Sequence, residues 1–165
     1  MRIRTGNSES FSIRRATAND SNGILECLSL AFAPFRESYS EEGFLDTTLT
    51  PETITKRLQE MLVLVAVQEG SIIGTIGCKV DESEGHLRGM AVRPEWQGSP
   101  VATELLAVAE QELYNAGCST ITLETTEPLK RAMRFYEKNG FRATGHIGNF
   151  FGMLLFKYRK QIRGK

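Results

Sequence analysis

Residues 87–117, LRGMAVRPEWQGSPVATELLAVAEQELYNAG, constrain the fold of this chain more than any other stretch. Their apolar start, residues 87–92, is typical of a buried strand, and Pro94 ends that strand because proline cannot donate to a sheet ladder. Ser99 then stands where it can cap a helix, and Pro100 takes the first helical position, where no N–H is needed. The sequence therefore predicts a strand that leads through a short turn directly into a helix.

The predicted helix has one apolar side and ends at Gly117, which supplies a left-handed residue. Its apolar residues fall on an arc of roughly 160° at 100° per residue, with Glu112 as the one misfit. They are Val101, Ala102, Leu105, Leu106, Val108, Ala109, Leu113 and Ala116. Such a helix start has unpaired amides and a partial positive charge, so it can hold a phosphate. An ordinary strand-to-helix connection gives the same pattern, and the glycine-rich phosphate-binding motifs are absent.

A second motif follows in residues 128–141, PLKRAMRFYEKNGF, which predict a helix closed by Gly140. The strand between the two helices is STITLETT, residues 119–126. Together, VRPEWQGSPVATELL, TLET and AMRFYEKNGF resemble the acetyl-CoA-binding core of the GNAT superfamily of N-acetyltransferases. The order of elements on either side also agrees, so the resemblance covers most of the chain.

The resemblance implies that acetyl-CoA is the cosubstrate and that no metal takes part. It implies that the main chain of Met90, Ala91 and Val92 pairs with the pantetheine amides and polarises the thioester carbonyl. The turn and the first helical residues would wrap the pyrophosphate, namely Gln97, Gly98, Ser99, Pro100, Val101, Ala102 and Thr103. It also implies a sheet that splays beside the strand ending at residue 92 to admit the pantetheine arm.

Two positions depart from the family pattern. Pro100 replaces a loop glycine and so removes one amide that could point at a pyrophosphate, although Thr103 can add a hydroxyl. Leu129 stands where the family has an asparagine. These departures leave open a degenerate GNAT module that binds an acyl-CoA or a partner without turnover.

Three residues are candidates for the chemistry. Tyr136 matches the family tyrosine that acts as general acid toward the sulfur, whereas periodicity alone predicts a core tyrosine. His86 and Glu124 match positions at which family members carry a base, and each also fits a solvated strand residue. Alternation places His86 on the same strand face as Met90. A water chain is a third route for the proton, so the base stays open.

Length predicts a single domain over residues 1–165, with frayed tails at 1–10 and 160–165, and the resemblance implies that it is an N-acetyltransferase (GNAT) domain. Twenty basic and twenty acidic residues cancel, so bulk charge gives no argument for nucleic acid or an anionic membrane. No apolar run approaches the length of a membrane span, and the cytoplasm is the default location. The three cysteines lack metal spacing and predict free core thiols, with a catalytic cysteine as the sharper alternative. A homodimer is left open.

The remaining elements complete an α+β (three-layer α/β/α) fold with a GNAT-like mixed, mostly antiparallel sheet of about seven strands and about four helices. Beside the two central helices, we predict helices at residues 20–32 and 51–61, the latter capped by Thr50. Further strands are predicted at residues 11–15, 62–68, 71–80, 85–92, 141–147 and 150–158. Hairpin turns are predicted at Glu69-Gly70 and Gly148-Asn149, and residues 33–49 are predicted to be irregular.

The function predicted from these residues is N-acetyl transfer from acetyl-CoA to a primary amine of a small molecule or protein. The resemblance assigns acceptor choice to residues 32–49, with Arg36 and Tyr39, and to residues 146–151. Carboxylates in the first segment could favour a cationic amine or simply form a solvated face. An α/β nucleotide binder that uses the helix start is the rival from another class, and it lacks the phosphate-binding lysine.

Overall fold

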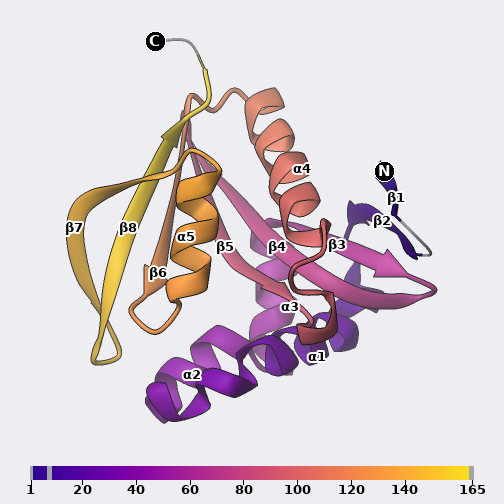
Figure 1. Ribbon diagram of the computed structural model, residues 1–165, viewed down its shortest axis with the longest axis horizontal. Helices are drawn as coiled ribbons and strands as arrows, with labels where there is room; N and C mark the ends of the chain where they lie inside the picture. The colour runs from indigo at the N-terminus through magenta and orange to yellow at the C-terminus, as the bar shows by residue number, and fades with distance from the viewer. Residues whose placement is uncertain (1, 7–8, 164–165) are drawn as a thin grey trace.

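The computed structural model describes residues 2–6 and 9–163, which form one eight-stranded sheet with five α-helices (Figure 1). The strands are β1 (Arg2–Gly6), β2 (Glu9–Arg15), β3 (Leu62–Gln68), β4 (Ser71–Asp81), β5 (Glu84–Val92), β6 (Thr120–Thr126), β7 (Arg142–Phe150) and β8 (Met153–Gln161). The helices are α1 (Ser21–Phe32), α2 (Glu41–Thr48), α3 (Pro51–Glu60), α4 (Val101–Asn115) and α5 (Lys130–Lys138). The predicted α+β class is confirmed, with one strand and one helix more than expected.

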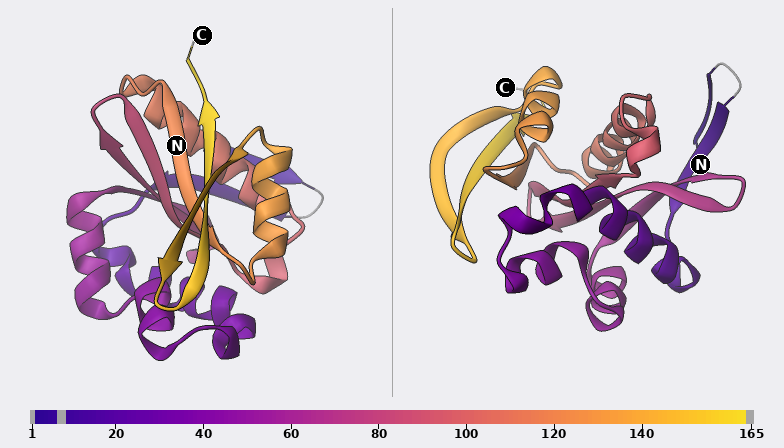
Figure 2. Two further views of the ribbon diagram at one scale, coloured as in Figure 1. Left: turned by 90° about the vertical axis from the view of Figure 1, so that its left-hand side faces the viewer. Right: turned by 60° about the horizontal axis from the view of Figure 1, so that its bottom comes forward.

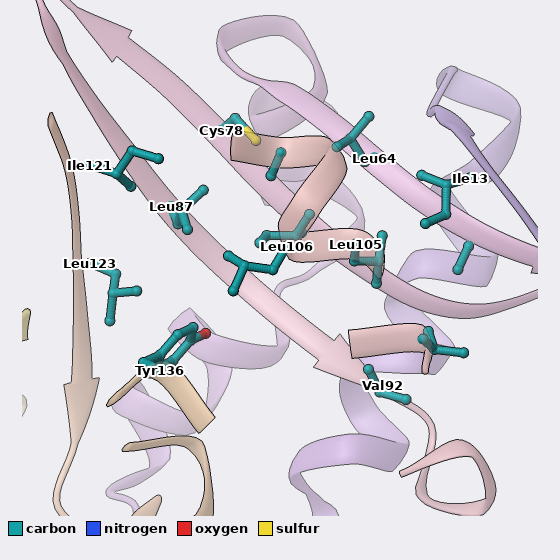
Figure 3. Close-up of a cluster of buried hydrophobic side chains, with 14 of the residues drawn as sticks. Ile13, Leu64, Cys78, Leu87, Val92, Leu105, Leu106, Ile121, Leu123 and Tyr136 are labelled. Carbon is teal, nitrogen blue, oxygen red and sulfur yellow. The ribbon is translucent and has the colours of Figure 1, made fainter. Parts of the chain in front are cut away.

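The strand order is β1-β2-β3-β4-β5-β6-β8-β7, and only β5 and β6 run parallel. Two apolar cores lie on the two faces of this sheet. One joins α4 and α5 to the central strands (Figure 3), and the other joins α1 and α3 to β3, β4 and β5. Figures 1 and 2 show the helices on opposite sides of the sheet, with α2 beside α1. The three-layer arrangement follows, because each face buries its own set of apolar side chains.

Several local predictions are confirmed at the residues that carry them. Thr50 caps α3 by accepting a hydrogen bond from the Thr53 amide at 3.3 Å. Gly117 takes a φ of +96° after α4. Glu112, the misfit on the apolar arc of α4, pairs with Arg15 at 3.1 Å. A carboxylate beside an apolar surface is tolerated here because its charge meets a partner at the edge of the core.

Two local predictions about the chain were wrong. Residues 33–49 hold a 3-10 helix, Ala33–Ser38, and then α2, which Ser40 caps by accepting from the Gly43 amide. The last hairpin turns at Phe151 and Gly152, not at Gly148-Asn149, and Asn149 Oδ1 accepts from the Gly152 amide at 2.7 Å.

The tails are also more ordered than expected. Residues Arg2–Gly6 form β1, which pairs with β2, and β8 extends to Gln161. The Ile162 amide donates to the Ser119 carbonyl at 2.9 Å, so the chain is tied down to that point. Residues 1, 7–8 and 164–165 of the predicted tails lie outside the described residues.

The feature that positions the site is a split between the two central strands. β5 and β6 pair only through Glu84↔Thr120, Gly85↔Ile121 and His86↔Thr122. Beyond His86 the two strands separate, as Figure 1 shows, so the second half of β5 has a free edge. The predicted splay beside the strand that ends at Val92 is confirmed.

Candidate active site

A cavity of about 1050 Å³ occupies the split between β5 and β6. Its walls come from both faces of the sheet: α5 and the turn before α4 on one side, and α1, α2 and α3 on the other. The free edge of β5, from Leu87 to Val92, runs along it. One continuous space therefore connects the two faces of the sheet through the gap.

A bulge in β5 shapes this free edge. Gly77 pairs with Arg88 but Thr75 pairs with Ala91, so β5 holds one residue more than β4 across the same span. Gly89 absorbs the extra residue with a φ of +67°, a left-handed conformation that glycine adopts without steric cost. The register gives Gly89 and Met90 no partner in β4 or β6, which leaves main-chain groups of this segment facing the cavity.

The bulge also reverses the alternation of side chains along β5. His86 lies beside Thr122 on the face that α1 and α3 cover, whereas the Met90 side chain reaches Tyr136 on the face of α5. The prediction that His86 and Met90 share a strand face is therefore wrong. A single inserted residue moves every later side chain of a strand to the other face.

The turn between β5 and α4 offers fewer free amides than the motif suggested. The Ser99 amide donates to the Trp96 carbonyl at 3.2 Å, and the Val101 amide donates to Ser99 Oγ at 3.3 Å. Pro100 is the residue before α4 and has no amide hydrogen. Within the described part of the chain, the amides of Gly98, Ala102 and Thr103 have no hydrogen-bond acceptor. These three are the donors left for a ligand at the helix start, where the peptide dipoles favour an anion.

Gln97 has a structural partner at the end of β5. Its Nε2 donates to the Val92 carbonyl at 3.0 Å, which fixes the turn against the strand. Gly98 has a φ of +84°, and a Cβ at this position would lie 3.7 Å from Arg131 Nη2 of α5. Arg131, Arg134 and Lys138 of α5 also line the cavity, so this side of it carries cations.

Tyr136 lies inside the cavity wall between the two separated strands. Its ring is 8% exposed and packs against Phe135 and Phe141, and Figure 3 shows it between Leu123 of β6 and the β5 strand. The hydroxyl donates to Met90 Sδ at 3.5 Å, a weak acceptor. Burial raises the pKa of Tyr136 well above its ordinary value, so the hydroxyl keeps its proton.

His86 and Glu124 both project toward the face of α1 and α3, but only Glu124 lines the cavity. Thr122 Oγ1 donates to Glu84 Oε2 at 3.0 Å and lies 3.0 Å from His86 Nδ1. Because the Thr122 proton goes to Glu84, we assign the Nδ1 proton to His86, whose Nε2 then carries the lone pair. Burial lowers the pKa of His86, with Arg88 acting in the same direction and Glu124 opposing it. His86 is therefore neutral at pH 7, and it lies opposite Thr122, two residues before Glu124 in the neighbouring strand.

The acceptor segments named from the sequence contribute unequally to the cavity. Tyr39 lines the cavity. Its hydroxyl oxygen lies 2.8 Å from Thr126 Oγ1, and its ring packs edge-on against Phe150. Arg36 instead stacks over the Phe44 ring, 4.7 Å from its centre, and does not line the cavity. Asp46 of α2 lines the cavity and pairs with Arg88 of β5 at 3.4 Å.

Most of the predicted site residues meet at this one cavity. Those that line it are Met90, Ala91, Val92, Gln97, Gly98, Ser99, Ala102, Thr103, Glu124 and Tyr136. Pro100 and His86 do not line it, and Val101 is a core residue with no exposed surface. Sequence reasoning missed Arg57, Arg131 and Thr125, which also line the cavity. The hydroxyl of Thr125 is buried without a hydrogen-bond partner in the described part of the chain.

The cysteines take no part in the cavity. Cys27, Cys78 and Cys118 are free and buried, as predicted. Burial raises the pKa of the Cys27 and Cys78 thiols to about 12, so neither is a thiolate at neutral pH. Among residues 2–6 and 9–163, no three His, Cys, Asp or Glu side chains are grouped so as to hold a metal. No helix within the same ranges is long and apolar enough to cross a membrane.

The split sheet, the bulged strand and the helix that starts at its end define an α+β domain with a cleft between its central strands. The sequence profile of the Acetyltransferase (GNAT) family matches residues 24–141, well over half of the chain. The chain therefore belongs to the GNAT family, as the motifs predicted, and is an acyltransferase of that type.

Curated relatives carry related names. An uncharacterized N-acetyltransferase of Methanocaldococcus jannaschii is 35% identical over 106 residues, which cover 61% of this chain and 68% of the relative. The N-alpha-acetyltransferase 30 of Schizosaccharomyces pombe is 37% identical over 82 residues, covering 47% of this chain. The N-alpha-acetyltransferase MAK3 of Arabidopsis thaliana is 28% identical over 62% of this chain. The chain spans 55% and 57% of the lengths of the last two relatives.

Solved structures share the fold at low sequence identity. The PaiA N-acetyltransferase of Thermoplasma acidophilum, crystallised with coenzyme A, superposes with a TM-score of 0.79 at 20% identity over 92% of this chain and 99% of that one. The ribosomal-protein-S18-alanine N-acetyltransferase of Escherichia coli gives a TM-score of 0.77 at 18% identity over 94% and 96% of the two chains. These likenesses establish the architecture.

Proposed function

We propose that this chain transfers an acetyl group from acetyl-CoA to a primary amine of a small molecule or a protein. The observation that carries the proposal is the free edge of β5 beyond His86, which faces the same cavity as the start of α4 and the Tyr136 hydroxyl. Main-chain donors, a helix N-terminus and a phenol are the groups that a thioester with a diphosphate tail would need. Family membership and the coenzyme A complex of the Thermoplasma acidophilum protein agree with it.

The residues on the α4 and α5 side fit coenzyme A. Free amides at Gly98, Ala102 and Thr103 face an anion site at the start of α4, and Arg131 lies beside Gly98. These donors would hold the diphosphate, and the bulged segment around Met90 would hold the pantetheine arm along the free edge of β5. When bound, acetyl-CoA supplies a thioester carbonyl that an amine can attack and a thiol as the leaving group.

The acceptor amine has to lose a proton before it can attack, because a lysine-like ammonium has a pKa near 10.4. Glu124 lines the cavity on the face of α1 and α3. Neutral His86 lies on the same face, where Nδ1 contacts Thr122 and the Nε2 lone pair can accept a proton. We assign Glu124 as the group that takes the proton and His86 as a neighbour that acts on it through its charge state.

Tyr136 serves the leaving sulfur. Its only hydrogen-bond partner among the described residues is the thioether of Met90, which another sulfur can replace at little cost. Because burial raises its pKa above that of a thiol, the hydroxyl stabilises a departing thiolate by donating a hydrogen bond. Attack leaves one surplus proton on the amide nitrogen; as the C–S bond breaks, the hydroxyl would give its proton to the thiolate and regain one from that nitrogen.

The test combines binding with turnover. Calorimetry with acetyl-CoA and with CoA measures the affinity of the proposed site, and a thiol-release assay over an amine panel measures transfer. Binding of both ligands together with amine-dependent thiol release supports the proposal. Binding without thiol release from any amine supports instead a non-catalytic module, the alternative suggested by Pro100 and Leu129. Absence of binding refutes both the acetyltransferase and the non-catalytic module.

A further inference from the structure

A guanidinium that makes no hydrogen bond or ion pair of its own among the described residues lies on the acceptor side of the cavity. Arg57 of α3, Arg88 of β5 and Asp46 of α2 all line this side. Asp46 pairs with Arg88 at 3.4 Å and attracts Arg57 through its charge, but the Arg57 guanidinium itself makes no hydrogen bond or ion pair with any residue that the structure describes. Two guanidinium groups therefore share a single carboxylate.

The guanidinium of Arg57 is held against the bulge of β5. A Cβ at position 89 would overlap Arg57 Nη1, so a side chain there would strain the backbone and would also push the guanidinium away from the bulge. The next residue along the free edge is Met90. The Arg57 charge is thus fixed at the point where the strand edge opens toward the proposed thioester.

Burial and the charge of Arg88 lower the pKa of Arg57 to about 10, while Asp46 opposes this shift. The guanidinium remains protonated at neutral pH. A cation that is partly removed from water and has no hydrogen-bonded anion is destabilising until one meets it. Arginine at such a site suits a carboxylate, because its planar fork forms two parallel hydrogen bonds with the two oxygens.

We propose that Arg57 binds a carboxylate carried by the acceptor amine. This inference rests on the proposed function and narrows its substrate class to amines that also bear an anionic group. Glu124 lies on the same face of the sheet, so one acceptor can present its ammonium to Glu124 and its carboxylate to Arg57. The carboxylate can belong to a free amino acid or to an acidic side chain near the N-terminus of a peptide.

The first experiment measures binding and needs no turnover. Calorimetry on CoA-saturated protein compares two matched sets of ligands. The first set pairs N-acetyl amino acids with their amides, and the second pairs N-acetylated peptides that carry Glu at the second position with the same peptides carrying Gln. In the wild type, the carboxylate member of one of these sets should bind about tenfold more tightly or better than its neutral partner. The set that shows the advantage identifies the source of the carboxylate.

Two variants and a control assign the effect to Arg57. Arg57→Gln should abolish the carboxylate advantage, and Arg57→Lys should keep only part of it because the fork is lost. Lys56→Gln removes the same charge from an exposed neighbour on α3 that does not line the cavity, and it should leave the advantage intact. Circular dichroism and the melting temperature show that each variant is folded.

The outcomes separate this inference from the proposed function. Equal affinity for carboxylates and amides in both sets overturns it, as does an advantage that survives Arg57→Gln. If an Arg57-dependent advantage exists but no amine releases thiol, acetyl transfer is refuted while the carboxylate site stands. If thiol is released as readily with amines that lack a carboxylate, and KM does not rise in Arg57→Gln, the carboxylate site is refuted while transfer stands.

Discussion

Replacing Gly89 with alanine tests the bulge on which the arrangement of the cleft depends. Gly89 has a φ of +67°, and a left-handed alanine costs about 1–2 kcal/mol, of which about 0.4–1 kcal/mol is offset by the lower entropy of the unfolded chain. The new methyl group also displaces Arg57 Nη1, and because this atom ends a flexible side chain the displacement adds about 1 kcal/mol, the low end of overpacking costs. We therefore expect a loss of about 1–3 kcal/mol in the free energy of unfolding.

Gly70→Ala is the matched control. Gly70 has a φ of +79° in the turn between β3 and β4, and no atom lies within 4 Å of a Cβ placed there. The free energy of unfolding of Gly70→Ala should fall only by the cost of the left-handed backbone, about 1 kcal/mol or less. For a chain of this size each kcal/mol lowers the melting temperature by about 2–4 °C, so the two variants separate clearly in thermal unfolding. The Gly70 variant should also keep its affinity for CoA.

The result that would refute this reasoning is a Gly89→Ala variant no less stable than Gly70→Ala. It would mean that Arg57 moves away from the bulge without loss, so that the guanidinium is not held there by its surroundings. The function readout is independent of this comparison. Displacement of Arg57 should reduce binding of a carboxylate-bearing N-acetyl ligand in Gly89→Ala and leave it unchanged in Gly70→Ala.

Three further predictions concern the proposed chemistry. Tyr136→Phe should lower kcat roughly 10- to 100-fold with little change in CoA affinity, because the lost hydrogen bond serves only the departing sulfur; unchanged kcat would remove its role. Pro100→Gly should tighten CoA binding about 3- to 10-fold by restoring an amide, partly offset by glycine entropy; equal or weaker binding in calorimetry would show that the proline is accommodated. Because the pKa of His86 is lowered, its protonation should impair kcat only below about pH 6.5, so activity rises with pH there and is flat above. His86→Gln should remove this acid limb while Glu124→Gln lowers kcat at every pH, and a pH profile of kcat that His86→Gln leaves unchanged would contradict the role of His86.

Local signals predicted the helices and the cofactor-side motif well. The apolar arc of α4, the cap at Thr50 and the left-handed Gly117 depend on neighbours within one or two turns, so the sequence carries them directly. Helix α2 was missed because it is only eight residues long and contains Gly43. Its signal was present nonetheless, since Ser40 precedes two glutamates as an N-cap does.

The hairpin of β7 and β8 shows where local signals mislead. Gly148-Asn149 has the composition of a tight turn, yet both residues lie in β7. Phe150 packs edge-on against Tyr39, which follows the 3-10 helix Ala33–Ser38, and Ser40 Oγ donates to the Phe151 carbonyl at 3.2 Å. Contacts with a segment more than one hundred residues away therefore place the turn at Phe151 and Gly152.

The sequence by itself determined the family, the helix start that faces the proposed diphosphate, and Tyr136 on the inner side of α5, because each rests on short-range spacing. Only the tertiary structure decided which side chains face which half of the cleft. The extra residue at Gly89 is visible only in the pairing of β5 with β4, and it places Met90 beside Tyr136 and leaves His86 on the opposite face. Arg57 reaches the same bulge from a helix thirty residues earlier through packing alone. Strand register and helix packing depend on long-range contacts, and no local pattern of residues encodes them.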